Sequence, residues 1–372
     1  MQTTHKFYYE DSREMSSVKD NSIDLVITSP PYPMIEMWDK QFAELNPDIS
    51  IALQSGDYGR VFEAMHCELD KVWGELFRVM KAGALACINI GDATRTFHKR
   101  FQLFANHARI QKRFIDLGFD ILPLILWRKQ TNAPNKFMGS GMLPAGAYVT
   151  LEHEYILLFR KGEKRIFPTG EAKLNRRQSA YFWEERNAWF SDLWDFKGTR
   201  QGNNNCERRS RSGAFPFILP FRLVNMYSVF GDTVMDPFSG TGTTALAAMA
   251  SARNSINVEL ESSFSNPSRE RIAIEGPGLK RHNQERIREH LKFVKRYECE
   301  KGSLKHINNY FGFPVMTRQE TDLKLFYPEP AVEIERDSFQ VSYFEDQEMQ
   351  TFKAEDLIQD QLRFADGIES AD

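Results

Sequence analysis

Short apolar runs alternate with longer segments of helical period along the first 265 residues. The runs are rich in β-branched residues and are bounded by glycine, proline or charged residues, which is typical of buried strands. Seven of them are predicted as strands, at residues 6–9, 23–28, 84–90, 121–127, 154–160, 234–235 and 256–258. Between them, apolar side chains recur every three or four residues, which predicts helices at 62–79, 99–117, 219–230 and 245–250. Strands and helices alternate, so the pattern indicates an α/β protein with a doubly wound sheet.

This alternation is interrupted in two places. Residues 161–211 are polar and basic and are interleaved with aromatic residues, and we expect most of these aromatics to form a small core of an inserted region. Beyond residue 265, a basic helix is predicted at 280–296 and β-like pieces at 333–334 and 339–344. We expect residues 266–372 to form a solvated accessory region with an acidic tail.

Composition narrows the class of protein. The chain has 372 residues, of which 41% are hydrophobic, and this is enough for a substantial core. No apolar run is long enough to predict a membrane span, and the N-terminus lacks the apolar stretch of a signal peptide. The cysteines at 67, 87, 206 and 299 form neither a Cys-x-x-Cys pair nor a cluster with histidine, so we expect a cytoplasmic protein without a metal site.

The net charge of −3 conceals an uneven distribution of charge. Residues 160–211 hold 13 Lys and Arg against 7 Asp and Glu, whereas residues 317–372 hold 5 against 15. A local excess of basic side chains favours contact with the phosphates of nucleic acid. The acidic total therefore does not exclude a DNA-binding protein.

A glycine-rich loop follows the apolar strand that ends at Met235. Asp236 and Pro237 end the strand, and Gly240 and Gly242 allow the chain to turn sharply and to expose backbone N–H groups. We expect Thr243 or Thr244 to cap the helix that follows. An ordinary strand-to-helix turn is the alternative, but the loop lacks both the third glycine of a dinucleotide fingerprint and the Gly-Lys-Ser/Thr of a phosphate loop.

Two further features accompany this loop. Glu259 and Glu261 end the next strand, where a Rossmann-like fold places a carboxylate for ribose hydroxyls. Far upstream, the strand at 23–28 leads into Ser29-Pro30-Pro31-Tyr32, which would lie at the carboxyl edge of the same sheet. His153 and its two glutamate neighbours do not predict a metal site, because three adjacent residues of a strand cannot all face one ion, and we interpret them as a solvated strand start.

Together the two motifs resemble the DNA methyltransferases that use S-adenosylmethionine to methylate amino groups. The segment 236–244 is similar to that family's cofactor loop, and residues 29–32 are similar to its catalytic motif. The catalytic motif precedes the cofactor loop, which resembles the permuted, so-called beta class, and the resemblance covers residues 5–265. It implies a Rossmann-like methyltransferase fold with a mixed seven-stranded doubly wound sheet, circularly permuted motif order and an inserted target-recognition region.

The resemblance also implies a division of the chain and roles for its residues. The catalytic half would be 1–160, the target-recognition region 161–211, the cofactor half 212–265 and the accessory region 266–372. Asp11 would approach the adenine amino group of the cofactor, although it is equally a helix cap for residues 12–18. The remaining cofactor-binding residues would be Phe215, Pro216, Asp236, Pro237, Phe238, Ser239, Gly240, Thr241, Gly242, Thr243, Glu259 and Glu261.

The catalytic residues implied are Ser29, Pro30, Pro31 and Tyr32. The Ser29 hydroxyl and the Pro30 carbonyl would accept hydrogens from an exocyclic amino group and free its lone pair for methyl transfer, while Tyr32 would stack on a flipped base. Serine at the first position is common in enzymes of this family that methylate cytosine N4, and aspartate in those that methylate adenine N6. We therefore expect an N4-cytosine methyltransferase, with an N6-adenine enzyme and a non-catalytic DNA-binding relative as the alternatives.

The expected partner is double-stranded DNA. Arg176, Arg177, Arg208, Arg209 and Arg211 of the recognition region would contact it. The segment 28–39 also resembles methylases that protect CTAG sites, so a cognate restriction endonuclease acting on the same site is a further expected partner.

Overall fold

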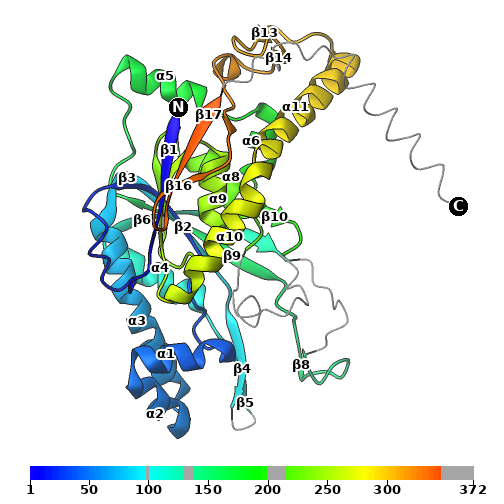
Figure 1. The fold of residues 1–372 in the computed structure, drawn as a ribbon. Helices are drawn as coiled ribbons and strands as arrows, with labels where there is room; N and C mark the ends of the chain where they lie inside the picture. The colour runs from blue at the N-terminus through cyan, green and yellow to red at the C-terminus, as the bar shows by residue number, and fades with distance from the viewer. Residues whose placement is uncertain (98–99, 130–137, 199–214, 345–372) are drawn as a thin grey trace, which may run out of the picture.

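The structure is a computed structural model that describes residues 1–97, 100–129, 138–198 and 215–344 (Figure 1). One sheet of eleven strands dominates these residues, with the order β10-β6-β9-β3-β2-β11-β12-β1-β17-β15 and with β16 paired to β17. The strands are β1 Gln2–Tyr8, β2 Ile23–Thr28, β3 Met80–Ile90, β6 Phe119–Arg128, β9 His153–Lys161, β10 Leu193–Asp195, β11 Thr233–Asp236, β12 Asn254–Val258, β15 Tyr327–Pro328, β16 Val332–Glu335 and β17 Ser338–Phe344. The seven predicted strands are all present, and four more extend the sheet at its two edges.

The sheet is mixed. Strands β3, β2, β11, β12 and β1 run parallel to one another, whereas β9 is antiparallel to both β3 and β6. Two-stranded pairs lie outside it, formed by β4 Ala93–Phe97 with β5 Arg100–Phe104, β7 Met138–Gly139 with β8 Ala147–Tyr148, and β13 His306–Ile307 with β14 Pro314–Val315. The carboxyl ends of β2, β3 and β11 therefore meet at one edge, which is where α/β enzymes bind their ligands.

Helices cover both faces of the sheet, with α3 and α4 on one side and α8, α9 and α11 on the other (Figure 1). Strand β2 serves both cores, because Val26 packs with Trp73 of α3 while Leu25 packs with Leu246 of α9. The α-helices are α1 Asp39–Leu45, α2 Pro47–Ser55, α3 Tyr58–Val79, α4 Asn106–Asp116, α5 Gly170–Gln178, α6 Trp183–Trp189, α8 Ile218–Tyr227, α9 Thr243–Ala250, α10 Ser265–Glu275 and α11 Lys280–Lys301. None of these helices is both long and apolar enough to cross a membrane.

One predicted helix begins too early and another is absent. Residues 100–104 form β5 and the helix α4 begins only at Asn106, because the alternating side chains of this segment pair with β4 in a hairpin. Residues 12–18 form turns instead of a helix, and Asp11 accepts the backbone N–H of Arg13 at 2.9 Å. The helix-cap alternative for Asp11 is therefore also wrong.

The region beyond residue 265 is joined to the main sheet. Strand β17 pairs antiparallel with β1, and a buried polar cluster crosses this pair, in which the Thr3 hydroxyl contacts His5 Nε2 at 2.8 Å and Tyr343 Oη at 2.9 Å. The predicted helix and β-like pieces lie within α11, β16 and β17. The expected solvated accessory region is thus wrong for β17, which completes the sheet.

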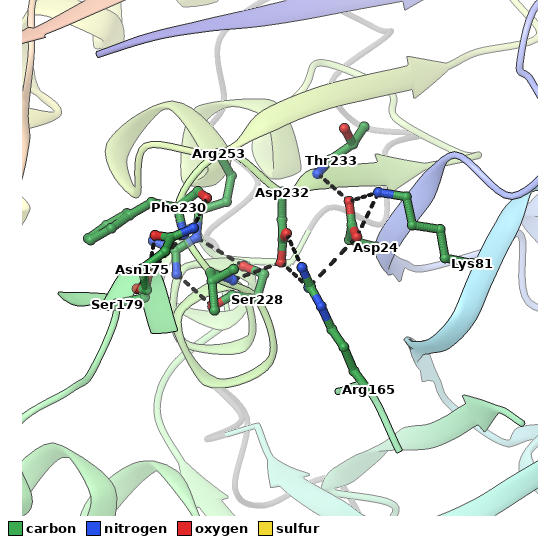
Figure 2. A network of polar contacts seen from close by, with 12 residues as sticks. Asp24, Lys81, Arg165, Asn175, Ser179, Ser228, Phe230, Asp232, Thr233 and Arg253 are labelled. Carbon is green, nitrogen blue, oxygen red and sulfur yellow. Dashed lines mark hydrogen bonds and ion pairs between the residues drawn. The ribbon is translucent and has the colours of Figure 1, made fainter. Parts of the chain in front are cut away.

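A second polar network ties the start of the recognition region to the amino ends of the strands (Figure 2). Arg165 forms a bidentate ion pair with Asp232, at 2.6 and 2.9 Å, and lies 3.7 Å from Asp24. The same Asp24 holds Lys81 at 2.7 Å and accepts the backbone N–H of Thr233 at 3.0 Å. Strands β2, β3 and β11 are therefore linked at the end opposite to the carboxyl edge.

Candidate active site

The two sequence motifs meet at the carboxyl edge of the sheet. Strands β2 and β11 are parallel neighbours, with Leu25 opposite Val234, so both chains leave the sheet at the same place. The Thr28 hydroxyl, one residue before Ser29, donates a hydrogen bond of 2.6 Å to Asp236 Oδ1. The segment 29–32 and the glycine loop are therefore directly coupled.

Asp236 is the centre of this coupling. Its side chain is 3% exposed, and it accepts hydrogen bonds from Thr28, from Thr244 Oγ1 at 2.7 Å and from the Phe238 N–H at 3.0 Å. Burial raises the pKa of Asp236 from 3.8 to about 6, and the three hydrogen bonds oppose that rise because they stabilise the charged form. Through these hydrogen bonds, Asp236 holds the glycine loop in place.

The glycines of the loop adopt left-handed backbone conformations. Gly242 has φ 80°, and a Cβ atom there would lie 3.0 Å from the Phe7 ring, so this position requires glycine. Gly240 has φ 49° and open space where a Cβ would stand. The predicted threonine cap is wrong: Gly242 is the N-cap of α9, Thr244 binds Asp236, and Thr243 Oγ1 accepts a hydrogen bond of 2.7 Å from Arg271.

Glu259 lies against this loop. One carboxylate oxygen accepts the Gly240 N–H at 2.8 Å and the other accepts the Glu261 N–H at 3.1 Å, and burial raises the pKa of Glu259. Glu261 is exposed and its carboxylate contacts Ser263 at 3.4 Å. The geometry therefore favours Glu259 over Glu261 for a ligand that rests on the loop.

The other expected cofactor residues occupy different positions. Asp11 follows β1, and its neighbour Ser12 donates a hydrogen bond of 2.5 Å to the Pro237 carbonyl, which brings this turn to the glycine loop. The Asp11 carboxylate is held by the guanidinium of Arg13 at 2.7 Å; burial acts to raise its pKa, but the bonds from Arg13 outweigh it and lower the pKa below the usual value. Phe215 is buried in the core with α8 and α9.

Ser29 and Tyr32 belong to a polar chain that extends beyond the predicted motif. The Ser29 hydroxyl lies 3.1 Å from Tyr32 Oη, which donates to Glu154 Oε2 at 3.0 Å. Asn89 Nδ2 donates to Tyr32 Oη at 2.9 Å and to Glu154 Oε2 at 2.7 Å, and Lys129 Nζ binds the second oxygen of Glu154. Burial, with the charge of Glu154, raises the pKa of Tyr32 well above its usual value, so its hydroxyl keeps its proton.

Asn89, Lys129 and Glu154 were not predicted from the sequence. Glu154 is not part of a solvated strand start, because its side chain is only 12% exposed and is fully engaged by the polar chain. A usable signal was the position of Asn89 and Lys129 at the carboxyl ends of β3 and β6, the edge that also carries Ser29.

Buried contacts hold the catalytic loop in place. Asn106 Nδ2 donates to the carbonyls of Pro33 and Gly91, both at 3.0 Å, while its Oδ1 lies 3.0 Å from His66 Nε2. A Cβ at Gly91 would stand 3.0 Å from the edge of the Tyr32 ring. The ring is therefore wedged beside β3, in a position set by the absence of a side chain at Gly91.

The predicted DNA-contacting arginines are not all brought to this edge. Arg176 lies over the Phe167 ring at 4.9 Å and Arg177 pairs with Asp322 at 2.7 Å. Both belong to α5, whose Asn175 binds the Phe230 carbonyl just before β11, at the amino ends of the strands. Arg208, Arg209 and Arg211 lie outside the described residues.

The aromatic residues of the segment 161–198 do not form the expected separate core: Trp189 and Trp194 join the main hydrophobic core, and Phe182 packs with Leu323 and Leu325. Trp183 and Phe190 are 38% and 37% exposed. A buried ion pair anchors this region to α11, because the Arg286 guanidinium binds both oxygens of Glu185 at 2.6 and 2.8 Å. The region beyond residue 265 thus supports α6 as well as the sheet.

Known proteins share this sequence and architecture. A family model described as DNA methylase, for N6 and N4 methyltransferases, matches residues 23–270. The Type II methyltransferase M.MthZI of Methanothermobacter thermautotrophicus is 50% identical over 350 residues, covering 93% of this chain and 96% of that protein. The Type II methyltransferase M.MjaI of Methanocaldococcus jannaschii is 46% identical over 283 residues, covering 73% of this chain and 92% of that protein.

A solved structure agrees with these relatives. The putative DNA modification methylase of Thermus thermophilus, complexed with S-adenosyl-L-methionine, is 34% identical and superposes with a TM-score of 0.57, covering 74% of this chain and 97% of that one. The match to the family model spans residues 29–32, the glycine loop and the residues between them. The chain therefore belongs to the DNA methylase family of N6 and N4 methyltransferases and is a DNA methyltransferase.

Proposed function

We propose that this enzyme transfers a methyl group from S-adenosylmethionine to the N4 amino group of cytosine in duplex DNA. The observation that carries the proposal is the arrangement of Ser29. Its hydroxyl hydrogen is directed at Tyr32 Oη, and its oxygen accepts only a long contact of 3.5 Å from Asn89 Nδ2, which leaves accepting capacity for a base. Serine at this position is common in members of the family that methylate cytosine N4, whereas aspartate is common in those that methylate adenine N6.

The chain's own residues fit the cofactor. The open side of Gly240, the buried carboxylate of Glu259 and the left-handed turn at Gly242 form a cradle that a side chain would obstruct. Glu259 would accept the ribose hydroxyls, and Asp11 would approach the adenine amino group. Phe215 and Pro216 would lie towards the methionine end. When bound, the cofactor supplies an electrophilic methyl group on its sulfonium.

Catalysis by the chain is mainly a matter of positioning. Ser29 Oγ and the Pro30 carbonyl accept the two amino hydrogens, which draws the nitrogen out of conjugation with the ring and frees its lone pair. Tyr32 offers a face for the flipped base, and Pro31 keeps the loop stiff. The bond from Thr28 to Asp236 holds this loop in register with the cofactor loop, so that the nucleophile and the methyl group can align.

DNA would approach the carboxyl edge, where Ser29 lies. Arg128 and Lys129 end β6 at this edge, and their side chains are 55% and 40% exposed. Gly198 is the last described residue before the segment 199–214. A Cβ atom placed on it would stand 4.0 Å from the Lys129 side chain. These positions favour this edge over α5 as the DNA-facing surface.

The enzyme would be the modification half of a restriction–modification system. Its relatives M.MthZI and M.MjaI are Type II methyltransferases, a class that acts at short specific sites. The resemblance of residues 28–39 to CTAG methylases makes CTAG the proposed recognition site, and an endonuclease that cuts the same sequence the proposed partner.

The test is to map modified bases in DNA from cells that express this chain, beside cells that express the Ser29→Ala variant. N4-methylcytosine at CTAG in the first culture, with little in the second, is the expected result. N6-methyladenine in place of N4-methylcytosine would reject the cytosine assignment. Modification at another sequence would reject the proposed site.

A further inference from the structure

We propose that Glu154, held by Lys129, is a positioning residue that sets the direction of the Tyr32 and Ser29 hydroxyls, so that Ser29 always presents lone pairs to the target amino group. The proposal rests on the role of Ser29 in the proposed function and holds for either base. It extends the site to strands β6 and β9, which the catalytic motif does not include.

The direction follows from what each group can donate. An ionised carboxylate only accepts, so Tyr32 Oη must donate its single hydrogen to Glu154 Oε2 at 3.0 Å. The remaining capacity of the Tyr32 oxygen is for accepting, and Asn89 Nδ2 uses one site at 2.9 Å. The Ser29 hydroxyl, 3.1 Å away, therefore has to donate to Tyr32. Its oxygen then accepts only the long contact of 3.5 Å from Asn89 Nδ2, so a lone pair is left for an amino group.

Asn89 reinforces this direction. Its Nδ2 also donates to Glu154 Oε2 at 2.7 Å, so the amide is oriented by the carboxylate and cannot turn its oxygen towards Tyr32 without repulsion. The Asn89 oxygen is buried and has no hydrogen-bond partner within the described part of the chain. Buried oxygens are usually satisfied, so this arrangement is costly, and it persists because the donors are needed at Glu154 and Tyr32.

Lys129 determines which oxygen of Glu154 accepts the hydrogen bond from Tyr32. It binds Oε1 and lies over the Trp127 ring at 4.7 Å, so its position is fixed from two sides. Lys129 can only donate, and it would force an amide at position 154 to turn its oxygen towards Lys129 and its NH2 towards Tyr32. Tyr32 would then accept a hydrogen bond from this NH2 instead of donating one. The Tyr32 and Ser29 hydroxyls would therefore point in the opposite direction.

Because of this reversal, a second substitution should restore activity that the first one removes. Glu154→Gln should slow single-turnover methyl transfer by roughly 10- to 100-fold at saturating cofactor and DNA, which corresponds to one charge-assisted hydrogen bond. Adding Lys129→Met should recover most of that loss, because the amide can then turn its oxygen to Tyr32. Glu154→Asp, which keeps an acceptor-only group, should retain more activity than Glu154→Gln.

A Tyr32→Phe background separates hydroxyl direction from a merely structural role. Without the tyrosine hydroxyl the chain is broken, so adding Glu154→Gln should change the rate no further, whereas a packing or charge defect would slow it again by the same factor. Thermal melting and cofactor calorimetry on each variant confirm that the folded state and cofactor binding are kept.

The outcomes separate this inference from the proposed function. An unchanged rate in Glu154→Gln, or an equal loss in the Tyr32→Phe background, overturns the inference while slow transfer in Ser29→Ala still supports the function. An unchanged rate in Ser29→Ala overturns the role of Ser29 and with it the inference.

Discussion

Thr28→Val should destabilise the protein more at pH 8 than at pH 5. Thr28 is fully buried, and valine has nearly the same shape, so the substitution removes little besides the 2.6 Å hydrogen bond to Asp236. At pH 8 Asp236 is ionised, and losing a hydrogen bond to a charged group costs about 1.5–3 kcal/mol. At pH 5 the carboxyl is mostly protonated, because its pKa is about 6, and the loss falls to about 0.5–1.5 kcal/mol.

The sign follows from proton linkage. Burial raises the pKa of Asp236 in the folded protein to about 6, above its ordinary value of 3.8, so the folded state binds this proton more tightly than the unfolded state. The contribution of this group to stability therefore falls as pH rises between about 4 and 6. Thr28→Val removes a donor to the charged form, which raises the pKa further and deepens the fall.

Urea unfolding followed by tryptophan fluorescence at the two pH values measures the effect. Thr3→Val is a matched control, because Thr3 is also buried and contacts His5 and Tyr343, not a carboxylate. Burial lowers the pKa of His5 to about 3 and raises the pKa of Tyr343, so neither residue changes charge between pH 5 and 8. Equal losses at both pH values in Thr28→Val would refute the reasoning.

Three further expectations concern ligand binding and anchoring. Glu259→Ala should weaken S-adenosylmethionine binding by about 10- to 100-fold in calorimetry, because its charge-assisted bonds are lost, and Glu261→Ala should change it little; the opposite order would move the role to Glu261. Arg128→Glu should weaken non-specific DNA binding and flatten its salt slope by about 0.9 per lost phosphate contact, measured by fluorescence anisotropy, whereas Arg177→Glu, at the other end of the strands, should not. Arg286→Met should cost about 3–5 kcal/mol of unfolding free energy in urea, since it leaves the buried Glu185 unpaired, and a cost under about 1 kcal/mol would contradict that anchor.

The strands of this fold were predictable because each is a compact apolar run bounded by breakers. The start of the segment 99–117 was not, because the apolar positions of 100–104 fit a helix as well as a strand, and pairing with β4 decides between them. The cap of α9 failed for a different reason. Threonine is a common cap residue, but the Thr244 hydroxyl donates its hydrogen bond to the ionised Asp236 at the end of β11 instead.

In the site, the sequence indicated the residues that belong to contiguous motifs. It could not indicate Glu154, whose partners Asn89 and Lys129 are 65 and 25 residues away along the chain. Nor could it separate the arginines of α5 from the reaction site, because only the fold places that helix at the amino ends of the strands. Site residues that belong to one contiguous motif can therefore be predicted from the sequence. Site residues that come from separate strands cannot.

Strand β1 has a consequence for the order in which this protein can fold during synthesis. It is made long before its two partners in the sheet, β12 and β17, because His5 contacts Ser255 across 250 residues and Thr3 contacts Tyr343 across 340. At about 5–20 residues per second, roughly 20 to 70 seconds pass before β17 is made. Until β12 is made β1 lacks both neighbours, and until β17 is made one edge of β1 keeps its unpaired backbone groups. Such an edge can pair with other chains, so we expect the nascent sheet to be open to association at β1 until β17 has been translated.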